Sequence, residues 1–167
     1  MSNTEITANA QSRLPNPAML VPEMAEVGAA LFKVVGNGSV PRTTIGLVQL
    51  RAGQIVGSEY LTVLHTGNLA RAGESDERVA AVASWRDAPH FTEAERVALE
   101  LVEAVYTAPA EGERVSDDVY ARASAQYDDK ALTTLILAIS QVSFFVPLAL
   151  IGKPLPGKAP EEQWRRP

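Results

Sequence analysis

The spacing of apolar residues along most of the chain constrains the fold most strongly, because it has the period of an α-helix. Leu20, Met24, Val27 and Leu31 recur at intervals of three and four residues, which places them on one face of a helix. No run alternates cleanly between apolar and polar residues, and no Asn-Gly or Asp-Gly turn joins two such runs. The sequence therefore predicts an all-α fold, a compact bundle of about seven helices.

Breaks in the pattern divide it into helices. The predicted helices cover residues 19–35, 40 to about 54–57, 58–72, 75–85, 92–106, 116–127 and 130–151. Thr92 and Glu95 have the spacing of a capping box, in which each side chain accepts a hydrogen bond from the other residue's backbone N–H. Pro147 is expected to kink the last helix.

The proline-rich ends indicate three parts. We expect a flexible N-terminal arm over residues 1–16, one all-helical domain over residues 17–152 and an extended tail over residues 153–167. The arm has neither a basic segment nor an apolar one and does not resemble a secretory signal, so a cytoplasmic location is the default expectation.

Residues 135–151 form the most apolar stretch. Polar residues and Pro147 interrupt it, which favours a buried helix over a membrane span. The net charge is −5 and no basic stripe is present, so neither nucleic acid nor a membrane is an expected partner. The chain has no cysteine and only two histidines, so we expect no disulfide, no thiol chemistry and no metal site.

Two segments carry a resemblance to a known family. Residues 57–65 read GSEYLTVLH, and residues 85–99 read WRDAPHFTEAERVAL. The first resembles the G-C-x-Y-C-x-x-x-H helix of the alkylhydroperoxidase D-like branch of the carboxymuconolactone decarboxylase family, and the second resembles the family's W-R-x-A-P-x-F-T-x-x-E-R-x-A-L stretch. The resemblance covers most of residues 20–150. It implies an alkylhydroperoxidase D-like helical fold and a homo-oligomer, trimer or larger, with its site near subunit contacts.

The sequence departs from this family where the peroxide chemistry resides. Ser58 and Leu61 stand at the positions of the two redox cysteines, while His65 stands at the position of the family's histidine. Gly46 stands at the position of the glutamate that relays protons in the family, about a dozen residues before the first cysteine. Peroxide reduction by the family mechanism is therefore disfavoured.

His65 is the candidate catalytic residue, as a general acid or base that needs no cofactor. A helix places Ser58, Leu61 and Thr62 on the same face as His65. The candidate residues for a pocket or for substrate binding are Ser58, Tyr60, Leu61, Thr62, Gln54 and Arg51. This set suits decarboxylation or isomerisation of a small organic acid, lactone or cyclic ketone.

Simpler structural roles compete with each of these assignments. His65 could be a packed structural residue, Ser58 is expected to cap its helix, and Arg51 is more typical of a salt bridge. The expected pocket beside His65 could also be filled by apolar side chains, those of Leu61, Leu64, Phe144 and Phe145. The alternative function is a non-catalytic member of the family that binds a small molecule or serves as a structural subunit.

Overall fold

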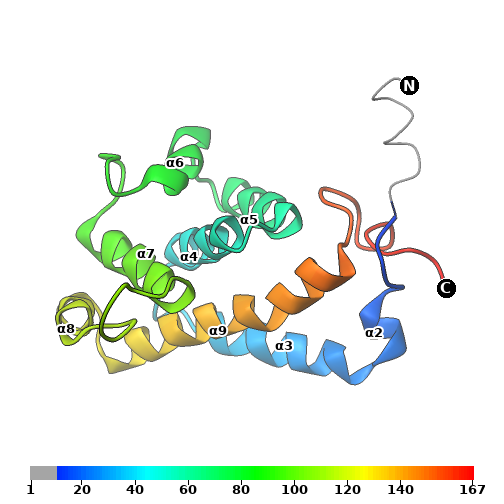
Figure 1. Cartoon of the computed structure of the whole chain (residues 1–167), viewed down its shortest axis with the longest axis horizontal. Coiled ribbons are helices and arrows are strands. Elements are labelled where there is room, and N and C mark those ends of the chain that lie inside the picture. Colours follow the sequence, from blue (N-terminus) through cyan, green and yellow to red (C-terminus); the bar gives the residue numbers. More distant parts are fainter. Residues whose placement is uncertain (1–10) are drawn as a thin grey trace.

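The computed structural model describes residues 11–167, and it confirms the all-α fold (Figure 1). Most of the predicted N-terminal arm, residues 1–10, lies outside the described residues. The helices are α2 (Pro17–Leu20), α3 (Glu23–Val35), α4 (Arg42–Ile55), α5 (Glu59–Arg71), α6 (Asp76–Ala81), the 3-10 helix η1 (Val82–Ser84), α7 (Glu93–Tyr106), α8 (Asp117–Gln126) and α9 (Asp129–Gly152).

Helices α3 and α9 run antiparallel as a long pair along one side of the molecule (Figure 1). Helix α4 lies against α5, α7 and α9 and so occupies the centre of the bundle. The short α6 and η1 connect α5 to α7. This arrangement places α5 and α9 on two sides of α4, where the candidate site lies.

Capping side chains fix the starts of all five α-helices from α5 to α9. Thr92 accepts a hydrogen bond from the N–H of Glu95, whose carboxylate accepts one from the N–H of Thr92 at 2.8 Å, which confirms the predicted capping box. The other side-chain caps are Ser58, Ser75, Ser116 and Asp128. Each satisfies a backbone donor that the helix cannot satisfy itself, so these starts agree with the sequence to within about two residues.

Two predicted helices are divided in the structure. Pro22 separates α2 from α3, because a residue before proline is pushed out of helical geometry and Val21 has φ −131° and ψ 83°. The predicted helix over residues 75–85 contains α6 and then η1, with Trp85 following as a buried residue.

Helix α4 contributes to two hydrophobic clusters. Val48 and Ala52 pack with residues of α7 and α9, whereas Leu47 and Leu50 pack with Leu69 and with residues of η1 and α7. Every residue from 44 to 50 is buried. A helix with buried residues all round belongs to the interior of a bundle, so α4 is the core element that supports the site.

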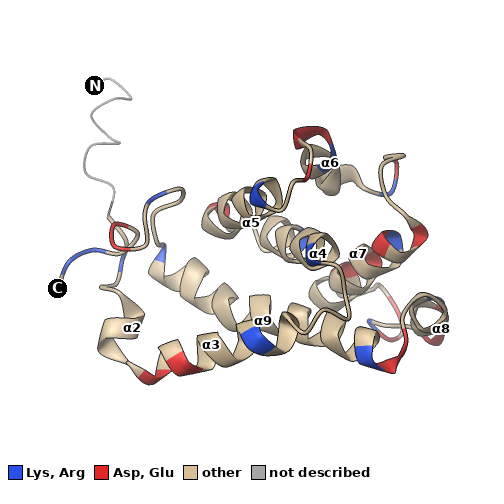
Figure 2. Ribbon diagram, turned by 180° about the vertical axis from the view of Figure 1, so that it is seen from behind, with Lys and Arg blue, Asp and Glu red and all other residues tan. Residues whose placement is uncertain are grey.

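Helix α9 is the one helix within residues 11–167 that is long and apolar enough to span a membrane by length and composition. Its residues Leu135, Ala138 and Val142 are buried in the core against α4 and α7, as expected of an interior helix. Between Lys130 and Lys153 it carries no charged residue, and Figure 2 shows it without colour over this length. Part of its apolar surface is exposed, including Ile136, Phe144 and Ile151.

The described part of the arm pairs with the tail. The N–H of Arg13 donates to the carbonyl of Gly152 at 2.8 Å, and the N–H of Arg165 donates to Oγ of Ser12 at 2.7 Å. Trp164 lies against Gly152, where an added Cβ would meet the indole at 2.7 Å. These contacts hold both segments against the end of α9.

Candidate functional site

A cavity of about 320 Å³ lies beside His65, and we refer to it as the inner cavity. Its lining residues come from α3, α4, α5 and α9 and are mostly apolar. They are Phe32, Gln49, Tyr60, Leu61, Leu64, His65, Asn68, Gln141, Val142 and Phe145. The volume is in the range of small-molecule sites, so these side chains leave the space open rather than filling it.

His65 is the titratable residue with the most perturbed environment in this cavity. Its side chain lies on α5 with 7% of the residue exposed, and Nδ1 is buried with no hydrogen-bond partner among the described residues. Burial lowers the pKa of His65 from its usual 6.5 to about 4. The imidazole is therefore neutral near pH 7 and has an unused polar atom.

Ser58 begins α5 and is not a lining residue of the inner cavity. Its Oγ accepts a hydrogen bond from the N–H of Leu61 at 3.2 Å, which confirms the predicted N-cap. Leu61 is almost completely buried and lines the cavity. It also packs closely on α4, since a Cβ on Gly53 would lie 3.1 Å from its Cβ. The two cysteine positions of the family thus hold a helix cap and a packed core residue.

Tyr60 lines the inner cavity and connects it to the tail. Its hydroxyl donates to Oε1 of Gln163 at 2.8 Å, and burial raises the pKa of the Tyr60 phenol. Tyr60 is therefore protonated near pH 7, and its proton is already directed to Gln163.

Three other candidates lie outside the inner cavity. Thr62 is half-buried on α5 but is not among the lining residues. Arg51 donates to Oε1 of Glu103 from Nε at 2.9 Å and to Oε1 of Gln54 from a terminal nitrogen at 3.2 Å. Trp85 Nε1 donates to the same Glu103 oxygen at 2.9 Å. Arg51 and Gln54 thus join α4 to α7, as the salt-bridge interpretation of Arg51 predicts.

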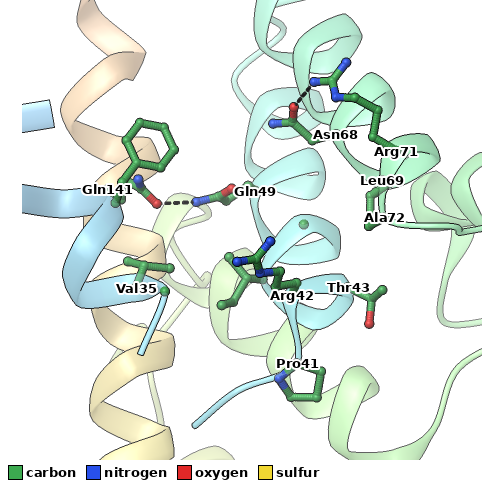
Figure 3. Close-up of a pocket in the computed structure, with 14 residues that line it drawn as sticks. Val35, Pro41, Arg42, Thr43, Gln49, Asn68, Leu69, Arg71, Ala72 and Gln141 are labelled. Carbon is green, nitrogen blue, oxygen red and sulfur yellow. Dashed lines mark hydrogen bonds between the residues drawn. The ribbon is translucent and has the colours of Figure 1, made fainter. Parts of the chain in front are cut away.

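A buried amide pair is part of the site that the sequence did not single out. Nε2 of Gln49 donates to Oε1 of Gln141 at 2.7 Å, which links α4 to α9 (Figure 3). In the sequence, Gln49 could not be distinguished from a helix-surface residue, and Gln141 only interrupted an apolar run. The available signal was that each glutamine stands in an otherwise apolar segment.

A second cavity, the outer cavity, shares part of its wall with the inner one. It measures about 930 Å³, and Phe32, Gln49, Asn68 and Gln141 line both cavities. Figure 3 shows Arg42 and Arg71 on its α4 and α5 sides. The two cavities are therefore adjacent, and the glutamine pair lies at their boundary.

The position of the family's glutamate is closed by packing. An ideal Cβ added to Gly46 would lie 2.7 Å from Cδ2 of Leu69, which is itself buried. A carboxylate therefore has no room there unless Leu69 moves. No group of three His, Asp or Glu side chains that could hold a metal ion lies together in residues 11–167.

Comparison with known proteins agrees with the fold. The sequence pattern of the carboxymuconolactone decarboxylase family matches residues 22–104. The uncharacterized protein YdfG of Bacillus subtilis is 28% identical over 124 residues, which are 74% of this chain and 83% of YdfG. The uncharacterized protein YnjA of Escherichia coli is 34% identical over 93 residues, which are 56% of this chain and 50% of YnjA.

Two solved structures resemble this one. The first is a protein of unknown function from Agrobacterium tumefaciens with a suggested assignment as the antioxidant defence protein AhpD. It has a TM-score of 0.79 and 25% identity, with 89% of this chain and all of that chain covered. The second is the debrominase Bmp8 in complex with 2,3,4-tribromopyrrole, with a TM-score of 0.69 over 80% of this chain and 72% of that chain. At 20% identity, this is a likeness of fold alone.

The fold and the site together define an alkylhydroperoxidase D-like helical protein without redox cysteines. The chain belongs to the carboxymuconolactone decarboxylase family.

Proposed function

We propose that the inner cavity binds a small organic acid, lactone or cyclic ketone, and that His65 acts there as a general acid/base without a cofactor. The observation that carries this proposal is the buried Nδ1 of His65, which has no partner in residues 11–167. An unpaired buried polar atom costs free energy, and its retention in a residue that lines an open cavity supports a role for the imidazole there.

The neutral charge state of His65 leaves a ring nitrogen able to accept a proton. A neutral imidazole can accept a proton from a carbon next to a carbonyl group and return it elsewhere on the ligand. The imidazolium formed in this apolar cavity needs a compensating negative charge, which an enolate or a carboxylate of the ligand supplies. Isomerisation and decarboxylation are the reaction types that meet this requirement.

Ligand-induced thermal stabilisation tests the binding part of the proposal. Wild type and His65→Gln are compared against small acids, lactones and cyclic ketones, with His90→Gln as the control because His90 lies outside both cavities. A compound at a hundredfold excess over Kd should stabilise wild type and the control by about 2.7 kcal/mol. Equal stabilisation of all three proteins would refute a role for His65.

Exchange of carbon-bound hydrogen for solvent deuterium tests the chemistry. We expect wild type in D₂O to introduce deuterium next to the carbonyl of a bound ketone or lactone, detected by NMR. His65→Gln should slow this exchange by about 10²–10⁴-fold, the usual contribution of a general acid or base.

A non-catalytic binding protein is the second candidate. It is favoured because no residue of 11–167 bonds to Nδ1 of His65, whereas a catalytic imidazole is usually oriented by a hydrogen bond to the nitrogen that does not react. Stabilisation by a ligand with neither deuterium exchange nor product formation would support this alternative.

Self-association as a trimer or larger assembly is part of the proposal. Large apolar side chains are exposed along α3 and α9, including Phe32 at 66% and Ile151 at 64%. Phe32 also lines both cavities, so a partner that covers it would narrow their openings. Sedimentation of wild type and of Phe32→Ser with Ile151→Ser tests this, and we expect a smaller species for the variant.

A further inference from the structure

The outer cavity carries a charge that the mechanism at His65 does not use. Among residues 11–167, Arg42 and Arg71 are its only charged lining residues, and no Asp or Glu of this part of the chain lines either cavity. This is unusual in a chain whose net charge is −5.

Neither arginine has a carboxylate partner within residues 11–167. The guanidinium of Arg71 donates to Oδ1 of Asn68. No carboxylate oxygen of the described residues lies within 4.0 Å of the guanidinium of Arg42 or of Arg71. Glu74, the acid nearest to Arg71 in sequence, pairs instead with Arg78 at 2.7 Å. The guanidinium groups of Arg51, Arg78, Arg86 and Arg122 pair with carboxylates, while those of Arg96 and Arg114 donate to backbone carbonyls.

The sequence on both sides of Arg42 also lacks negative charge. Residues 27–58 contain no Asp or Glu, and the first turn of α4 has no acidic residue. Arg42 is the first residue of α4, and the N-cap Pro41 supplies no capping side chain. The positive end of the helix therefore adds to the charge of Arg42 instead of being offset.

The two cavities adjoin each other through shared lining residues. Asn68 lines both cavities and also holds Arg71 (Figure 3). On the opposite wall, Gln49 and Gln141 present amide groups at the boundary. From the arginines toward His65, the surface thus changes from cationic to amide to mostly apolar.

We propose that the positive charge of Arg42 and Arg71 attracts the carboxylate of an amphipathic organic acid, that one of the two guanidinium groups bonds to it, and that the apolar body of the acid extends past the glutamine pair toward His65. Arginine is suited to this role because its planar guanidinium donates two parallel hydrogen bonds to a carboxylate. The inference rests on the proposed function and narrows its ligand class from acids, lactones and ketones to compounds with an anionic end.

Two probes of the same shape test this: cyclohexanecarboxylate and cyclohexanecarboxamide, with affinities measured by calorimetry. Arg42→Gln with Arg71→Gln removes the charges, and Lys130→Gln with Lys158→Gln is the control, because it changes the net charge equally and lies outside both cavities. All four positions are exposed, so both variants should fold, which circular dichroism checks.

We expect the arginine variant to lose about tenfold or more in affinity for the carboxylate and to bind the carboxamide as wild type does. The lysine control should keep its affinity for the carboxylate. Salt should weaken carboxylate binding to wild type much more than to the arginine variant.

Equal losses for both probes, unchanged carboxylate affinity in the arginine variant, or no binding of the carboxylate to wild type at millimolar concentration would each overturn the inference. His65→Gln separates it from the proposed function. If carboxylate binding depends on the arginines but not on His65, the inference holds and the role of His65 fails. If carboxylate binding depends on His65 but not on the arginines, the inference fails and the role of His65 stands.

Discussion

Nε2 of Gln49 donates a hydrogen bond to Oε1 of Gln141 over 2.7 Å, and this contact joins α4 to α9 where the two cavities meet. Both residues are buried, so each amide depends on the other for a partner that the apolar surroundings do not supply.

Replacing both glutamines should therefore cost less than the sum of the two single replacements. Gln49→Leu or Gln141→Leu leaves a buried amide without its partner, and we expect each to lower the free energy of unfolding by about 1–3 kcal/mol. The double variant removes both polar groups and should lose clearly less than the sum. Urea denaturation of the four proteins measures the coupling, and strictly additive losses would contradict a paired role.

His65 should make the stability of the fold depend on pH. Its pKa is about 4 in the folded state against an ordinary 6.5, so the unfolded chain binds the proton more tightly. The stabilising contribution is complete above about pH 6.5 and is lost as the pH falls to about 4, by about 3 kcal/mol in total. His65→Gln should lose correspondingly less stability than wild type between pH 7 and pH 4 in urea titrations. Parallel losses in the two proteins would show that His65 titrates normally.

Ser58 should act through the helix and not through the ligand. Ser58→Ala removes the hydrogen bond to the N–H of Leu61 and should cost about 1 kcal/mol of stability. Ser116→Ala, which removes the corresponding cap of α8, is the matched control and should cost a similar amount. Ligand affinity at His65 should not change in either variant. Loss of activity without loss of stability in Ser58→Ala would instead indicate a nucleophile.

Gly46 and Gly67 should respond in opposite directions to alanine. Both lie inside helices, where alanine is preferred over glycine by about 1 kcal/mol. A Cβ at Gly67 meets only a flexible Arg71 nitrogen at 3.6 Å, so Gly67→Ala should stabilise the protein. A Cβ at Gly46 meets buried Leu69 at 2.7 Å, so Gly46→Ala should destabilise it. Thermal unfolding of both variants measures the two changes in stability. Stabilisation by Gly46→Ala would mean that Leu69 moves easily.

The same packing bears on restoring the family's peroxide site. Ser58→Cys with Leu61→Cys returns the two thiols, but the relay also needs Gly46→Glu, for which Leu69 leaves no room. We expect the triple variant to unfold at lower temperature than the double variant and to show no dithiol-dependent peroxide turnover. Turnover by the triple variant would show that the backbone still accommodates the family's site.

The helices could be predicted from the sequence because local signals fix them. Thr92, Ser116 and Ser58 mark helix starts by chemistry that acts within three residues, and the apolar period shows which faces are buried. The division at Val21 and Pro22 was missed because the apolar period continues across it.

The composition of the site depends on contacts between helices, which the sequence of one helix does not reveal. His65, Tyr60 and Leu61 line the inner cavity, whereas Arg51 is on the α7 side of α4, paired with Glu103. Residues 42, 71 and 141 are far apart in the sequence, so only the packing of α4, α5 and α9 brings them to one cavity.

The most direct test of the central claim is an NMR titration of the His65 imidazole, with His90→Gln used to assign the signals of the two histidines. We expect a pKa of about 4 in the free protein, and no rise when cyclohexanecarboxylate is bound, because its carboxylate lies at the arginines of the outer cavity and its apolar ring lies toward the imidazole. A pKa near 6.5 would show that His65 is not a buried residue of a ligand site.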